Sequence, residues 1–256
     1  MLNNQLQAIY IMWLRQMKQF VRRKSRMVAM VVQPLFFLAI LGAGFREAIL
    51  PGMEGDFLVF FAPGIIAMAI LFSSVFTGVS ILYDKQFGFL QEVLVAPVSR
   101  LSITIGRTLG GGTTALIQGF IILIITIFIR IEIPSIFGLI LTVIFMILIS
   151  FTAVGFGLLL ASKMEDFQGF QIIMNLLIMP LFFLSSAFFP IANTGLPDFL
   201  VAVSFANPLF YMVDGLRGSL TGINNVFHPL VDLVIVFIFC VIMLSLGSHS
   251  FGKSEA

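Results

Sequence analysis

Charged side chains are scarce in this sequence. Asp, Glu, Lys and Arg make up 10% of its 256 residues, whereas a soluble domain carries about 25%. A folded chain with so few charges cannot cover most of its surface with groups that water solvates. This scarcity, together with the lack of any long polar stretch, excludes a soluble globular domain.

The residues that usually carry catalysis or bind metals are also few. Cys240 is the single cysteine and lies in an apolar run, which excludes an intrachain disulfide and leaves the redox compartment undetermined. His228 and His249 lie far apart in the chain, so no shared metal site is indicated. No catalytic triad or carboxylate pair is recognisable. We therefore expect a protein that is not an enzyme, binds no metal or cofactor of its own, and has no nucleic-acid partner.

Apolar residues fill the sequence instead. They account for 59% of the chain, with 30 Phe and a mean hydropathy of +1.11. A helix needs about 20 consecutive apolar residues to cross a bilayer. We predict an all-α integral membrane protein in which residues 1–256 form one domain with six transmembrane helices. The expected spans are 27–45, 57–82, 103–129, 136–161, 169–189 and 230–246.

Residues 5–24 precede these spans and alternate apolar and polar side chains at helical period. Arg15, Lys18 and Arg22 lie away from the apolar face. The pattern predicts an amphipathic helix in the membrane interface, with its basic side toward anionic headgroups. A packed helix of a soluble type is the alternative. The apolar face consists of Leu6, Ile9, Tyr10, Trp13, Met17, Phe20 and Val21.

Residues 84–97 follow the second expected span and are too polar to cross a bilayer, yet they keep a helical pattern. Asp84 can cap the start of a helix, and Pro97 can end it. A helix outside the membrane with an exposed apolar face requires a partner to bury that face. We predict a docking helix for a partner protein. Its apolar residues are Phe87, Leu90 and Leu94 on one face and Phe89 and Val93 on the neighbouring face.

Residues 190–227, before the last span, are interrupted by Pro, Gly and Asn. Their apolar segments, 199–206 and 209–213, are too short to cross a membrane. We predict a re-entrant hairpin of two short helices that enter one leaflet and turn back. Asp214 and Arg217, three residues apart, are expected to form an exposed ion pair worth less than ~1 kcal/mol.

The distribution of Lys and Arg predicts the orientation. With six spans, both termini lie on one side, and that side carries 11 of the 14 Lys and Arg residues. Basic loops favour the cytoplasm. We therefore predict cytoplasmic termini, a cytoplasmic docking helix and an external re-entrant hairpin.

Small and polar residues mark contacts within the expected spans. Glycines at 106 and 110–112 predict close helix approach near the start of the third span. Polar stripes in the second and fifth spans line a substrate path or form ordinary hydrogen bonds between helices. None of their side chains is ionisable, which argues against a proton or ion pathway. The stripe residues are Thr77 and Ser80, and Gln171 and Asn175.

Residues 247–254 read Gly-Ser-His-Ser-Phe-Gly-Lys-Ser and match the phosphate-loop pattern of nucleotide-binding proteins. A working phosphate loop follows a strand and begins a helix that faces the phosphates. Here the pattern follows a membrane span and only two residues come after it. We therefore expect no ATP site in this chain.

Two segments carry a family resemblance that extends over the whole chain. Residues 87–99 (Phe-Gly-Phe-Leu-Gln-Glu-Val-Leu-Val-Ala-Pro-Val-Ser) contain a Gly, Leu-rich turns and a small residue-Pro-x-Ser ending. Residues 207–217 contain Asn-Pro, aromatic residues, Asp and Leu-Arg before the last span. Both resemble the type-two ABC export permeases, especially the drug-resistance and nodulation-factor export branch. Relatives often have the acidic residue one position before Glu92.

This resemblance implies a permease dimer, with a second copy of the chain or a related permease, and two copies of a cytoplasmic ABC ATPase that binds ATP-Mg. The docking helix would be the coupling helix seated in the ATPase. The implied coupling residues are Phe87, Phe89, Leu90, Glu92 and Leu94.

We therefore expect a multi-pass permease of the cell membrane that exports a hydrophobic or amphipathic compound, either drug, lipid-like or glycan-linked. A secondary transporter is the first alternative, but the inverted repeats and interrupted helices typical of that class are not found. A non-transporting membrane scaffold is the second, and a docking helix alone does not exclude it.

Overall fold

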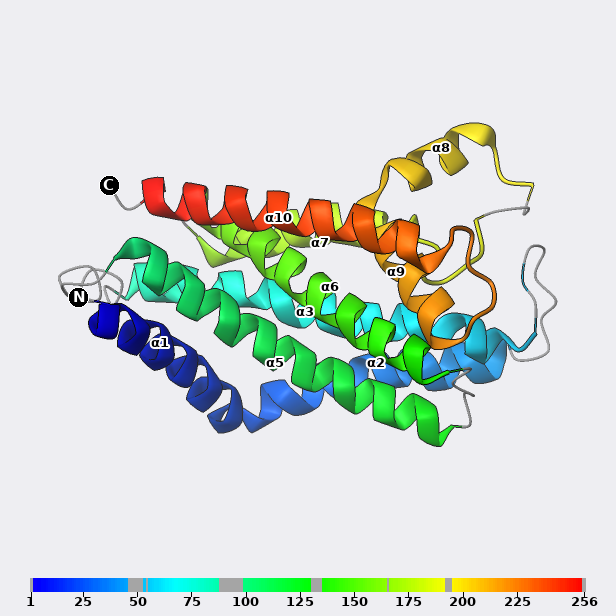
Figure 1. Ribbon diagram of the computed structural model, residues 1–256, viewed down its shortest axis with the longest axis horizontal. Coiled ribbons are helices and arrows are strands. Elements are labelled where there is room, and N and C mark those ends of the chain that lie inside the picture. Colours follow the sequence, from blue (N-terminus) through cyan, green and yellow to red (C-terminus); the bar gives the residue numbers. More distant parts are fainter. Residues whose placement is uncertain are drawn as a thin grey trace.

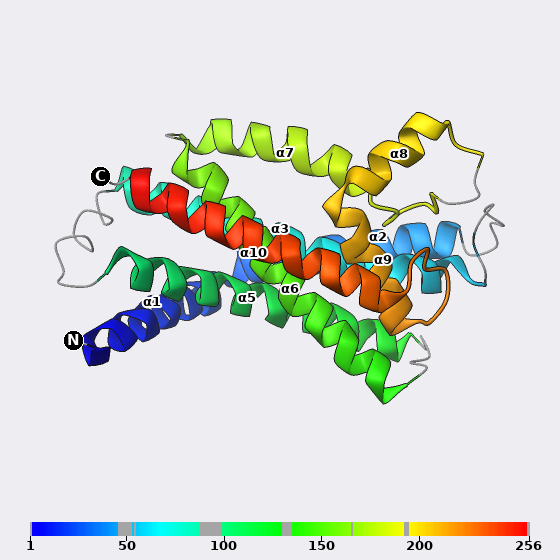
Figure 2. The same cartoon turned by 45° about the horizontal axis from the view of Figure 1, so that its top comes forward.

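The computed structural model describes residues 2–45, 53, 55–87, 99–129, 135–164, 166–191 and 195–254. The all-α class is confirmed, because this described part forms helices joined by turns and contains no strand. The helices run mostly lengthwise in one elongated bundle (Figures 1 and 2). They are α1 (Leu2–Arg22), α2 (Lys24–Gly44), α3 (Phe57–Gln86), α5 (Arg100–Phe128), α6 (Ile136–Ser162), α7 (Phe167–Phe183), α8 (Asp198–Ala206), α9 (Pro208–Leu220) and α10 (Pro229–Ser254).

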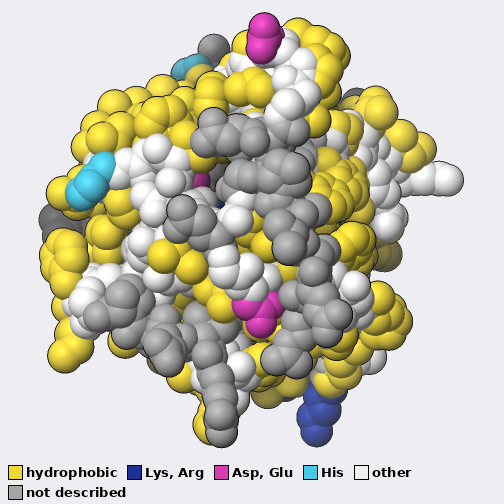
Figure 3. Space-filling model, turned by 90° about the vertical axis from the view of Figure 1, so that its right-hand side faces the viewer, with side chains coloured by type: hydrophobic (Ala, Val, Ile, Leu, Met, Phe, Trp, Pro, Cys, Tyr) yellow, Lys and Arg dark blue, Asp and Glu magenta, His cyan; other side chains and the backbone are white. Residues whose placement is uncertain are grey.

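Both chain termini lie at the same end of the bundle, which we call the terminal end (Figure 1). The end of α3 and the start of α5 are also there. The opposite, distal end carries α8, α9 and the turn into α10. Viewed onto the distal end, the described surface is mainly hydrophobic with scattered charged side chains (Figure 3).

Five described helices, α2, α3, α5, α6 and α10, are long and apolar enough to cross a membrane. The count rises to six if α8 and α9, bent by 83° relative to each other, form one broken span. The chain is therefore a multi-pass membrane protein. Helix α7, where a span at 169–189 was expected, has 17 residues, or about 26 Å against a hydrocarbon core of ~30 Å. Turns replace the helix from residue 184 onward.

Side-chain caps explain where several helices begin. Ser99 accepts a hydrogen bond from the Ser102 amide at the start of α5. Ser135 and Asp166 cap α6 and α7 through the amides three residues ahead. Each cap satisfies a backbone N–H that has no partner within its helix. Asn207 caps α9, and the following proline suits the first helical position.

Helix α3 occupies the centre of the bundle, and glycines allow other helices to approach it closely. A Cβ atom added at Gly111 of α5 would lie 2.4 Å from the Thr77 hydroxyl of α3. One added at Gly78 of α3 would lie 2.5 Å from the Gly157 carbonyl oxygen of α6. The close helix approach predicted from the 110–112 glycines is confirmed at Gly111.

Helix α1 packs along α5 at the terminal end (Figure 2). Cβ atoms added at Gly106 and Gly110 would collide with α1, and the Trp13 indole N–H donates to Thr113 Oγ1 at 3.2 Å. The other side of α1 leaves apolar residues exposed, including Leu6 and Tyr10. The predicted apolar face is therefore divided: Ile9 and Trp13 pack on α5, whereas Leu6 and Tyr10 remain exposed.

Candidate functional site

The four predicted path residues line two different hollows, and both hollows are bordered by Phe76. Thr77 and Ser80 line the first hollow, between α1, α2, α3 and α5. Gln171 and Asn175 line the second, between α3 and α7. Because Phe76 borders both hollows, the structure does not bring the four residues together in one cavity.

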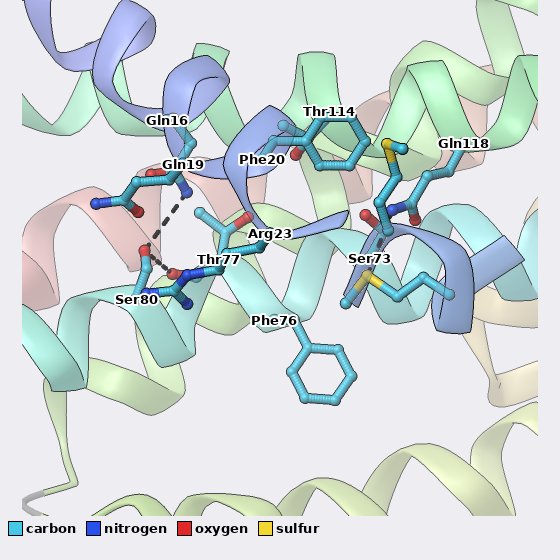
Figure 4. Close-up of a pocket in the computed structure, with 12 residues that line it drawn as sticks. Gln16, Gln19, Phe20, Arg23, Ser73, Phe76, Thr77, Ser80, Thr114 and Gln118 are labelled. Carbon is cyan, nitrogen blue, oxygen red and sulfur yellow. Dashed lines mark hydrogen bonds between the residues drawn. The ribbon is translucent and has the colours of Figure 1, made fainter. Parts of the chain in front are cut away.

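The first hollow is open on one side and offers about 60 Å³ of free space, which is room for a small polar group and not for a whole drug-sized ligand. Polar side chains gather at both of its ends (Figure 4). At one end Gln16 Nε2 donates to Ser80 Oγ at 3.4 Å, and Ser80 Oγ donates to the Thr77 carbonyl at 2.7 Å. At the other end Gln118 Nε2 contacts Met30 Sδ at 3.3 Å. We call this hollow the polar pocket; its lining residues are Gln16, Gln19, Phe20, Arg23, Met27, Met30, Ser73, Phe76, Thr77, Ser80, Thr114 and Gln118.

A charge cluster joins three helices at the terminal end. Arg15 of α1 donates from both terminal guanidinium nitrogens, one to each carboxylate oxygen of Asp84 on α3. Arg107 of α5 approaches the same carboxylate at 2.9 Å. Arg107 also lies 5.6 Å from the centre of the Phe251 ring on α10. We call Arg15, Asp84 and Arg107 the terminal cluster.

The terminal cluster corrects two predictions. Asp84 does not cap a docking helix, because α3 continues without interruption through Gln86. Arg15 does not face lipid headgroups but points into the bundle, where a buried carboxylate offers it a bidentate partner. Periodicity places Arg15 on the polar side of α1, yet it cannot show that Asp84 lies there.

The predicted coupling residues begin immediately after the terminal cluster. Phe87 is 78% exposed, and its ring stacks on that of Tyr83 with the centres 6.1 Å apart. It is thus an apolar side chain open for contact, in the residue that directly follows the end of α3 and three residues after Asp84. Phe89, Leu90, Glu92 and Leu94 lie outside the described residues.

A second charge cluster lies at the distal end and surrounds Arg217 of α9. Arg217 Nε donates to the Phe60 carbonyl at 3.1 Å, and its two terminal nitrogens donate to the Ser186 hydroxyl and carbonyl at 3.0 and 2.6 Å. Its guanidinium carbon lies 3.9 Å from the Phe60 ring centre. Ser186 adopts a φ of 59°, a conformation uncommon for a residue other than glycine. This backbone turn presents both Ser186 acceptors to one guanidinium.

Two carboxylates complete this distal cluster of Asp214, Arg217 and Asp232. Asp214 accepts hydrogen bonds from the Val226 and Phe227 amides at 2.9 Å and lies 3.9 Å from Arg217. Asp232 is fully buried and lies within side-chain hydrogen-bonding range of Asp214, while no N–H group of the described ranges donates to its oxygens.

The prediction of an exposed Asp214–Arg217 pair is therefore wrong. Both side chains are 1% exposed or less, because α9 packs against α3, α6 and α10. Spacing along one helix shows that two charges can meet, but it does not show what covers them. A signal was available: ionisable residues in an apolar membrane segment face the protein interior by default.

The sequence pattern at 247–254 has no phosphate-loop geometry. These residues continue α10, which extends to Ser254 as a regular helix. A phosphate loop needs a non-helical turn whose amides face the anion.

Comparison with known proteins assigns the class. The family model described as ABC-2 type transporter matches residues 7–221, and the chain belongs to that family. It is a membrane permease of the ABC transporter type.

Several transport permeases are similar along most of the chain. The transport permease ycf38 of Cyanophora paradoxa is 30% identical over 215 residues, which cover 83% of this chain and 73% of the relative. The inner membrane transport permease YadH of Escherichia coli (strain K12) is 28% identical over 242 residues, 90% of each chain. YbhR of the same organism, named for multidrug ABC transport, is 29% identical over 160 residues, 62% of this chain and 43% of its own length.

Proposed function

We propose that this chain is the permease subunit of an ATP-driven exporter in the cell membrane, moving a hydrophobic or amphipathic compound out of the cell. A second permease copy, identical or related, and two cytoplasmic ABC ATPase subunits complete the transporter. Family membership supports this partnership, because ABC-2 permeases work with an ATPase subunit. The name of YbhR supports a drug-like substrate.

The observation that carries the proposal is the position of Asp84. It lies two residues before the end of α3 and is held by Arg15 of α1 and Arg107 of α5. The chain then enters residues 88–98 and returns as α5. A partner that moved residues 88–98 would therefore pull on three helices through one carboxylate.

The two hollows beside Phe76 suit such a movement. A small rotation of α3 would change the access to Thr77 and Ser80 on one side and to Gln171 and Asn175 on the other. We propose these four polar residues as part of the substrate path, with the membrane core supplying the apolar surroundings.

The test is Leu90→Asp in the complete transporter. Burying a leucine at a contact is worth about 1.5–3 kcal/mol, so a buried charge in its place should weaken ATPase binding at least tenfold, or ~1.4 kcal/mol. Co-purification of the co-expressed ATPase and ATP-dependent transport in proteoliposomes should both be lost. Glu92→Gln, at the rim of the contact, should cost less.

The matched control is Leu196→Asp, which makes the same change at an exposed leucine of the distal end. It should leave ATPase binding unchanged. Full ATPase binding and normal export by Leu90→Asp would show that residues 84–97 do not couple the two subunits.

A further inference from the structure

The polar pocket contains an unsatisfied buried amide. Gln118 is fully buried, its Nε2 contacts only the Met30 thioether, and its Oε1 has no hydrogen-bond partner within the described part of the chain. Rotating the amide by 180° exchanges the two atoms and leaves one end equally unpaired. A buried polar group left without a partner costs free energy comparable to a lost hydrogen bond. A ligand group in the pocket would recover that energy.

The charge of the pocket defines what it can hold. Arg23 is the one charged side chain among the described lining residues, and the lining includes no carboxylate. Arg23 also forms no ion pair with a described carboxylate. Hydroxyl and amide groups make up most of the other polar lining, from Gln16, Gln19, Ser73, Thr77, Ser80 and Thr114. The chemistry fits an anion that also carries hydroxyl groups.

The depth of the pocket sets the length of the ligand. Arg23 immediately precedes α2, and Met30 lies seven residues further along, or about 10 Å of helix. Met30 contacts Gln118, so the unpaired amide lies about two helical turns of α2 from Arg23, toward the other end of the pocket (Figure 4). Four apolar side chains line the remaining wall: Phe20, Met27, Met30 and Phe76.

We propose that the polar pocket binds the phosphate-bearing polyol headgroup of an anionic lipid from the adjacent leaflet. The phosphate faces Arg23, a headgroup hydroxyl donates to Gln118 Oε1, and the chains leave past the apolar wall. Phosphate and guanidinium groups form strong charge-assisted hydrogen bonds. Thr77 and Ser80 belong both to this pocket and to the proposed substrate path. Because the lining comes from this chain alone, lipid binding can be measured without the ATPase.

The experiment measures lipid binding to the purified full-length permease in detergent by native mass spectrometry. Phosphatidylglycerol and phosphatidylcholine are titrated separately, and glycerol 3-phosphate is added as a competitor. Selective binding of one or a few phosphatidylglycerol molecules is expected. If glycerol 3-phosphate displaces phosphatidylglycerol, the pocket recognises the phosphate-polyol group whether it belongs to a lipid or to a soluble phosphate ester. Equal binding of phosphatidylglycerol and phosphatidylcholine would overturn the proposal.

Variants assign the binding to the pocket. Arg23→Gln should weaken phosphatidylglycerol binding about tenfold, equivalent to ~1.4 kcal/mol. Arg22→Gln makes the same change at the preceding, exposed residue, which does not line the pocket, and should have little effect. An equal loss in both variants would show surface attraction without a site.

Gln118→Leu tests the buried amide. It should reduce the preference for phosphatidylglycerol over phosphatidylcholine severalfold without lowering the unfolding temperature, since it also removes an unsatisfied group. Unchanged lipid preference in this variant would overturn the role of Gln118, and hence the placement of the headgroup. Gel filtration of each variant verifies that the permease remains folded.

Discussion

The two ends of the bundle each hold a charge cluster, but the clusters differ in composition and in access to water. In the terminal cluster one carboxylate, that of Asp84, forms ion pairs with two guanidinium groups, and the Arg15 side chain remains 25% exposed. In the distal cluster one guanidinium, Arg217, lies among two carboxylates, and all three side chains are almost completely buried.

The partners differ as well. Arg217 and Asp214 bond mainly to the backbone of other segments, through Phe60, Ser186, Val226 and Phe227. In the terminal cluster, by contrast, the Arg15 and Arg107 guanidinium groups contact the Asp84 side chain. The comparison indicates that the distal cluster fixes several segments together, whereas the terminal cluster, which lies beside residues 88–98, is partly reached by water through Arg15.

Arg217→Met should have the largest effect. Removing the cation leaves two buried carboxylates and the acceptors of Phe60 and Ser186 without their donor, which typically costs 3–5 kcal/mol. We expect a large loss of unfolding free energy in detergent, or no folded protein. Arg217→Lys is the control, because it keeps the charge and loses the planar set of donors. Its unfolding free energy should lie between those of the parent and Arg217→Met. An Arg217→Met variant whose unfolding free energy lies within ~1 kcal/mol of the parent's would contradict a fixed structural role for the distal cluster.

Asp84→Asn should have a smaller effect on stability and a clear effect on transport. The amide keeps the size of the carboxylate but loses its charge. Arg15 can turn to water, whereas Arg107, which is 3% exposed, keeps the amide oxygen as an acceptor. We expect a cost of about 1–2 kcal/mol in unfolding, together with reduced ATP-dependent transport. If Asp84→Asn lowers the unfolding free energy as much as Arg217→Met does, the two clusters do not differ in their contribution to stability, contrary to this prediction.

Arg15→Gln should have the smallest effect on unfolding. Arg107 still pairs with Asp84, and an ion pair with a partly exposed member is worth less than ~1 kcal/mol. The remaining difference from the parent should shrink at high salt, because salt screens exposed charges. Thermal unfolding at low and high salt measures both effects. A large loss of thermal stability that does not change with salt would show that the terminal cluster is as buried and as structurally fixed as the distal cluster.

Much of the helix pattern could be predicted from sequence, because apolar runs and caps act locally. The all-α class and the starts of α3 and α6, at residues 57 and 136, follow from such signals. The end of α7 could not be predicted in this way. Its apolar run continues beyond Phe183, but the chain turns so that Ser186 can meet Arg217, a residue 31 positions away.

The candidate site was less predictable for the same reason. Thr77 and Ser80 share a helix face, so sequence could group them, but their partner Gln16 comes from α1. The buried position of Gln118 depends on where α2 lies against α5. Periodicity identifies which residues of one helix lie together, and it contains no information about which face of another helix covers them.

The last prediction assigns the two ends to sides of the membrane. Lys and Arg gather at the terminal end, so we expect that end in the cytoplasm and the distal end outside. Single cysteines at Gln86 and Asp198, both exposed and at opposite ends, would be introduced in a Cys240→Ala background. An impermeant maleimide should label position 198 in intact cells and position 86 only after permeabilisation. Both substitutions are at the surface, where most changes cost within ~0.5 kcal/mol, so an altered pattern would report orientation and not misfolding. Labelling of position 86 alone in intact cells would invert the assignment, placing the terminal cluster and residues 88–98 beyond the reach of a cytoplasmic ATPase.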